Sequence, residues 1–70
     1  MNTAYYQNLR QVQKIKNAIE EYRIQILEVS NSNTIEDGLK KLFIEKLKIF
    51  KRIEEYHLKK LTEQMKSTSD

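Results

Sequence analysis

Apolar residues in the first half of the chain recur at alternating steps of three and four. This heptad pattern predicts an amphipathic helix over about residues 4–29, with Asn2 or Thr3 as its N-cap. A seam of nearly four heptads indicates coiled-coil-like packing against another helix. The two seam positions are occupied by Tyr5, Val12, Ile19 and Ile26, and by Asn8, Ile15, Tyr22 and Val29.

A second apolar stripe runs from Leu39 to Met65, again at helical spacing. It predicts a second helix over about residues 34–66, followed by a tail of residues 67–70. Gly38 weakens the first turn by about 1 kcal/mol relative to Ala, so the start of this helix is open between residue 34 and Leu39. The stripe consists of Leu39, Leu42, Phe43, Ile49, Phe50, Ile53, Tyr56, Leu61 and Met65.

The run Ser30-Asn31-Ser32-Asn33 predicts the loop between these helices, because its side chains bond their own backbone and compete with helix continuation. Thr34 with Asp37, or Asn33 with Glu36, has the form of a capping box for the second helix. A loop this short between two long helices predicts an all-α antiparallel hairpin, in one domain of residues 1–70.

Reflecting the chain about the loop predicts which residues of the two helices meet. It places Ile26 near Leu39, Tyr22 near Leu42 and Phe43, Ile15 near Ile49 and Phe50, and Val12 near Ile53. The predicted core of the hairpin and its dimer is Val12, Ile15, Ile19, Tyr22, Ile26, Leu39, Leu42, Phe43, Ile49, Phe50 and Ile53.

The small size of the chain favours association of two such hairpins. Seventy residues bury little surface alone, and with no Cys and a single His, disulfides and a metal are not available as supports. Ile44, Leu47 and Leu58 lie off the main stripe and leave surplus apolar surface. We therefore expect a homodimeric four-helix bundle.

Composition and charge narrow the function classes. No uncharged run is long enough for a bilayer or a signal-peptide core, and the absence of Cys fits a reducing cytosol, so we expect a cytoplasmic protein without a membrane partner. Residues 39–66 hold nine basic and four acidic residues, a net charge of +5, which makes the second half the electropositive one.

Candidate chemistry is sparse, and we expect neither an enzyme nor a cofactor or metal. His57 has no clustered metal ligands, and the pairs Glu20-Glu21 and Glu54-Glu55 are interpreted as a solvated face with Arg23, Lys51 and Arg52 as ion partners. No phosphate loop, nucleophile set or dinucleotide fingerprint is present. Lys46 interrupts the second stripe opposite Ile15 and Ile19. We interpret it as a packed stem with a solvated ammonium, the alternative being a register-setting polar position.

The last part of the second helix is the predicted docking segment. Reflection pairs it with the start of the first helix and then carries it past that helix, so its apolar residues should lack intramolecular cover. A basic amphipathic helix of this kind fits a groove on a larger protein. Nucleic acid is the less favoured partner, because no third helix or exposed stacking aromatics are visible. The predicted partner-binding residues are Arg52, Leu58, Lys59, Leu61, Met65 and Lys66.

In plan, with the Ser30–Asn33 loop and the Arg52–Lys66 helix, the chain resembles the small internal scaffolding proteins by which staphylococcal phage satellites redirect helper-phage capsids to a smaller size. The resemblance covers nearly the full length and is one of plan and composition. It implies a dimer in the bacterial host cytosol and inside procapsids. It also implies that the C-terminal helix binds the inner face of the major capsid protein.

A second resemblance is to the sporulation-type aspartyl-phosphate phosphatase hairpin, which acts on response regulators. Ile19-Glu20-Glu21-Tyr22-Arg23 and Ile53-Glu54-Glu55-Tyr56 are similar to its two helices. Its Ser-Gln-Glu-Leu-Asp signature is replaced here by Lys46-Leu47-Lys48-Ile49-Phe50, which lacks the Asp and the polar pair. This alternative implies a small regulator that binds a response regulator or kinase, and it ranks below the scaffold.

Overall fold

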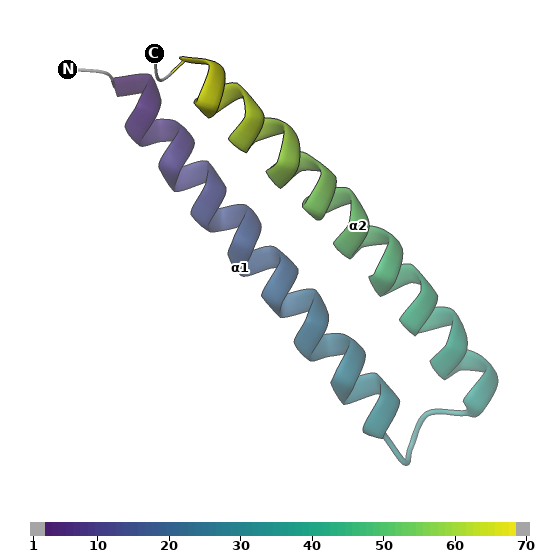
Figure 1. Cartoon of the computed structure of the whole chain (residues 1–70). Helices are drawn as coiled ribbons and strands as arrows, with labels where there is room; N and C mark the ends of the chain where they lie inside the picture. The colour runs from purple at the N-terminus through teal and green to yellow at the C-terminus, as the bar shows by residue number, and fades with distance from the viewer. Residues whose placement is uncertain (1–2, 69–70) are drawn as a thin grey trace.

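The computed structural model describes residues 3–68, which form two long helices packed antiparallel: α1 over Thr3–Asn31 and α2 over Asp37–Thr68 (Figure 1). The predicted all-α hairpin is confirmed. The start of α1 lies beside the end of α2, and the loop closes the opposite end of the rod (Figure 1). The rod measures 53 × 15 × 11 Å.

α1 ends later than predicted. The Ser30 hydroxyl donates a hydrogen bond to the Ile26 carbonyl at 2.7 Å, and the Ser32 backbone N–H reaches the Val29 carbonyl at 3.2 Å. A serine that bonds back to the preceding turn is compatible with a helix, so the first half of the predicted loop is helical. The predicted N-cap Asn2 lies outside the described residues.

α2 begins at Asp37, inside the range from residue 34 to Leu39 that the sequence left open. Thr34 is tied to the loop instead, because its backbone N–H donates to the Ser32 hydroxyl at 3.3 Å. The Glu36 carbonyl accepts from the Lys40 N–H at 2.9 Å, which makes it the first helical acceptor of α2. The cap predicted at Thr34 is therefore wrong. At the other end α2 continues through Thr68, so the predicted tail is wrong for residues 67–68, and residues 69–70 lie outside the described part.

The predicted seam of α1 does face α2. Its side chains are buried or half-buried at the heptad positions, whereas Tyr5 at the start is 44% exposed. Ile15 is the one buried side chain among residues 4–66, at 7% exposure. The inward row of α1 is Asn8, Val12, Ile15, Ile19, Tyr22, Ile26 and Val29.

The face that α2 turns toward α1 differs from the predicted one. A row at heptad spacing is half-buried against α1, and we call it the inner row: Ile44, Leu47, Lys51, Glu54, Leu58, Leu61 and Met65. The six α2 residues predicted for the core, Leu39, Leu42, Phe43, Ile49, Phe50 and Ile53, are instead 45–59% exposed. The single hairpin therefore does not bury these six side chains as a core, although Phe50 still contacts Tyr22 of α1.

The register between the helices accounts for part of this difference. The Tyr22 ring stacks on Phe50 with centroids 6.0 Å apart, one heptad later than the predicted partner Phe43. Because α1 ends later and α2 begins later than predicted, each residue of α2 lies opposite a residue of α1 that is closer to the loop than the predicted one. Leu61 and Gln64 therefore line a hollow with Gln11 and Ile15. The prediction that the end of α2 outruns α1 is also wrong.

Candidate protein-interaction surface

The most apolar face of α2 lies mostly outside the contact with α1, which it meets along the edge that holds Phe43 and Phe50. We call it the outer stripe, and its side chains are each about half exposed. They lie at heptad spacing on a helix whose inner row already packs on α1, so a single hairpin leaves about half of each side chain uncovered. The outer stripe consists of Leu39, Leu42, Phe43, Ile49, Phe50, Ile53 and Tyr56.

The size of the outer stripe is unusual for an isolated chain. Seven half-exposed side chains of roughly 200 Å² each present about 700 Å² of accessible surface. The largest apolar patch on a typical monomer covers about 300–600 Å², and patches above that size mark interaction surfaces. The outer stripe therefore has the extent of a binding face.

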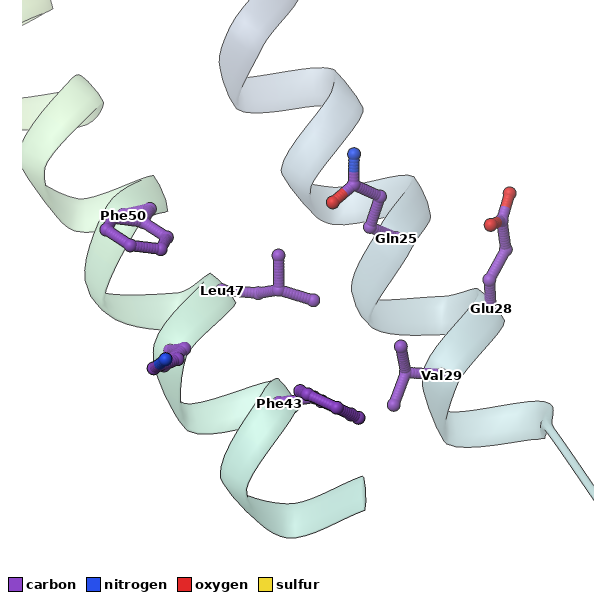
Figure 2. A pocket seen from close by; sticks show the side chains of 7 residues that line it. Gln25, Glu28, Val29, Phe43, Leu47 and Phe50 are labelled. Carbon is purple, nitrogen blue, oxygen red and sulfur yellow. The ribbon is translucent and has the colours of Figure 1, made fainter. Parts of the chain in front are cut away.

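A hollow opens where the outer stripe meets α1. Its apolar floor comes from Val29, Phe43, Leu47 and Phe50, and its volume is about 310 Å³. Figure 2 shows Phe43 and Leu47 directed toward α1 and Val29 directed toward α2. The polar residues that also line this hollow are Gln25, Glu28 and Lys46.

Lys46 thus lies across from Gln25 and Glu28, and not across from Ile15 and Ile19 as predicted. Its side chain is exposed in the single hairpin. It interrupts the outer stripe halfway along, which makes it the one charged position within that face of α2.

A third row of α2 carries exposed cations. We call it the basic ridge: Lys41, Lys48, Arg52, Lys59 and Lys66, interleaved with Glu45, Glu55 and Glu63. Lys48 and Arg52 border a shallow hollow of about 220 Å³ beside Ile49. The ridge and the outer stripe occupy different sides of the same helix.

The predicted partner-binding residues divide between two sides of α2. Arg52, Lys59 and Lys66 are exposed on the basic ridge. Leu58, Leu61 and Met65 belong to the inner row and are half-buried. The structure does not bring the six together as one docking face.

Two of the three side chains predicted as ion partners, Arg23 and Lys51, form ion pairs with glutamates of their own helices. Two nitrogens of the Arg23 guanidinium, Nε and Nη2, donate to the Glu20 carboxylate, with the Nε–Oε2 distance at 3.0 Å. This hydrogen bonding holds the pKa of Glu20 below its ordinary value. Lys51 lies 3.7 Å from Glu55. These contacts support the interpretation of a solvated charged surface.

His57 is exposed and borders a hollow of about 380 Å³ together with Glu54, Lys60 and Gln64. Over the described residues, no group of three His, Cys, Asp or Glu side chains is placed to hold a metal ion. Neither helix, within residues 3–68, has the length and hydropathy that a bilayer crossing requires.

Comparisons of the chain with protein-family models, curated proteins and solved structures find no significant match.

The inner row was missed as a packing face because two heptad rows coexist in α2. The row of Ile44, Leu47, Leu58, Leu61 and Met65 has the same spacing as the outer stripe but contains Lys51 and Glu54. The sequence does indicate the inner row, through an uninterrupted three–four spacing from residue 44 to residue 65. The outer stripe is the more apolar of the two rows, so hydrophobicity alone favours the wrong one.

Proposed function

We propose that this chain is a non-enzymatic scaffold or adaptor that acts through helix–helix contacts. The observation that carries the proposal is the division of α2 into an inner row packed on α1, an apolar outer stripe and a basic ridge. A helix with two exposed faces of different chemistry can hold two different partners at once.

The outer stripe suits another helical surface, because half-exposed Leu, Ile and Phe side chains at heptad spacing pack as knobs into the holes of a facing helix. The basic ridge suits an acidic surface on a larger protein, where charge complementarity sets orientation and association rate. We assign the ridge residues Arg52, Lys59 and Lys66 to the larger partner.

The resemblance to capsid-size-redirecting scaffolds supplies a concrete candidate for that partner, the inner face of a major capsid protein. Leu58, Leu61 and Met65 pack toward α1, so the proposed contact is electrostatic. It should weaken as salt rises, because exposed charge pairs are screened within about 8–10 Å at physiological ionic strength.

The first prediction tests the ridge with charge reversal. The triple variant R52E/K59E/K66E should abolish co-sedimentation with capsid shells, because it replaces three cations with carboxylates. The matched control R10E/K14E/K16E makes the same change at three exposed cations of α1 and should bind as the unmodified chain does.

Equal loss of shell binding in the two triple variants would contradict a specific role of the ridge. Shell binding retained in both variants would show that the ridge does not contact the shell. Strong salt-dependent retention of the unmodified chain on random DNA, lost in R52E/K59E/K66E but kept in the control, would make nucleic acid the partner of the ridge. Circular dichroism of each variant checks that the hairpin is intact.

A further inference from the structure

The outer stripe has the dimensions and spacing to bind its own copy. We propose that two chains associate through their outer stripes, with the two α2 helices antiparallel about a two-fold axis that passes between Lys46 and Ile49. This inference names a partner for one surface of the proposed adaptor. It does not depend on what the basic ridge binds.

The area favours a second copy as the occupant. A standard protein interface buries about 800 Å² per partner, and the outer stripe offers about 700 Å² of exposed apolar side chain before α1 contributes. Val29 and Gln25 of α1, which line the hollow beside the stripe, extend that surface. One isologous contact would therefore cover the whole stripe at once.

The spacing of the stripe is self-complementary when the helix is reversed. Leu39, Lys46 and Ile53 share one heptad position, and Leu42, Ile49 and Tyr56 share the other. In an antiparallel pair of helices, the first position of one chain packs against the second position of its partner. Leu39 then meets the partner's Tyr56, Ile53 meets the partner's Leu42, and Lys46 meets the partner's Ile49, so every layer is filled.

Lys46 favours the antiparallel arrangement over the parallel one. In a parallel pair each residue meets its own copy, which would place two ammonium groups in a single layer of the seam. In the antiparallel pair the two Lys46 residues occupy successive layers, about 4.5 Å apart along the helix axis. Glu28 borders the same hollow as Lys46 and offers that ammonium a carboxylate from its own chain.

Spin labels test the orientation without touching the stripe. The chain has no cysteine, so single-cysteine variants K48C and K59C each place one label on the basic ridge of each chain. In the antiparallel register the two copies of residue 48 lie about 1.5 Å apart along the axis and the two copies of residue 59 lie about 35 Å apart.

Electron–electron distance measurement should therefore give a separation about 20 Å longer for labels at 59 than for labels at 48. Equal distances at the two sites would overturn the antiparallel register, and the absence of any dipolar coupling would overturn self-association.

Two substitutions check that the stripe itself is the contact. Ile49→Glu should weaken self-association at least tenfold, whereas Leu27→Glu, at a residue of α1 that is equally exposed but lies off the stripe, should leave it unchanged.

Lys46→Ile tests the same contact with a substitution that should strengthen it, so unfolding of the variant cannot produce the expected result. It should tighten association about tenfold, because it removes a charge from a buried layer. An unchanged dissociation constant in this variant would overturn the proposal. If the unmodified chain self-associates but does not bind capsid shells, the proposed partner of the ridge is wrong, whereas the self-association proposed here is unaffected.

Discussion

Two charged residues, Lys51 and Glu54, lie in the row of α2 that packs on α1. Lys51 keeps 31% of its side chain exposed and reaches Glu55, so its stem packs on the seam while its ammonium meets solvent and a carboxylate. The more apolar row of the same helix remains outside. Within the hairpin, the row of α2 that packs on α1 is therefore the inner row, which mixes apolar and charged residues. The more apolar outer stripe stays about half exposed.

The Glu20–Arg23 pair gives a prediction at the same scale. The Arg23 guanidinium lowers the pKa of Glu20, chiefly by hydrogen bonding. A carboxylate whose folded pKa is depressed contributes stability above its unfolded pKa, and that contribution is lost as pH falls through the folded pKa. Because both groups are solvated, the effect on unfolding is small and the titration is the sharper measurement.

In an NMR pH titration, Glu20 should therefore show a lower midpoint in the unmodified chain than in Arg23→Gln. A midpoint that is the same in both would show that the pair does not persist in solution. The substitution Arg10→Gln serves as the control, because it removes a cation from the same helix without touching Glu20.

At the scale of elements, α1 could be predicted from sequence and the packing of α2 could not. α1 has a single row of apolar heptad positions, so its inward face follows from spacing alone. α2 has two such rows, and only the three-dimensional register decides which one meets α1. That register depends on where Asp37 starts the helix, and the hydrogen bonds of Ser30 and Thr34 that set this start compete closely with helix formation.

The candidate interaction surface likewise has features that could be predicted from the sequence and features that could not. The outer stripe and the basic ridge were both visible as patterns, and the exposure of Arg52 and Lys59 follows from composition. Leu58 and Leu61, which were predicted for the docking face from the reflected register, are half-buried in the inner row of the hairpin. The observed register differs from the reflected one by one heptad, so α1 partly buries residues near the end of α2 that were expected to be uncovered.

Gly38 provides a prediction for the start of α2. It lies in the first helical turn with no positive backbone angle, and a Cβ added there would meet only the flexible Glu36 carboxylate at 3.8 Å. Gly38→Ala should therefore stabilise the fold by about 1 kcal/mol. That increment should raise the melting temperature by about 4–8 °C in thermal denaturation. A lower melting temperature would show that residue 38 is not helical in solution.

At the scale of the whole molecule, the hairpin is a rod with little interior. Its radius of gyration is 16.1 Å, against about 11 Å for a compact chain of this length. Ile15 is the one buried side chain among residues 4–66, and the seam on either side of it is half-buried. A second copy against the outer stripe would convert the exposed row of α2 into core and make a four-helix bundle.

The most direct test of this association is equilibrium sedimentation of the full chain at micromolar concentration. We predict a folded species of twice the chain mass of 8.4 kDa, with a melting temperature that rises with protein concentration, because folding and association are linked. A folded, helical species of 8.4 kDa whose melting temperature does not change with concentration would contradict it.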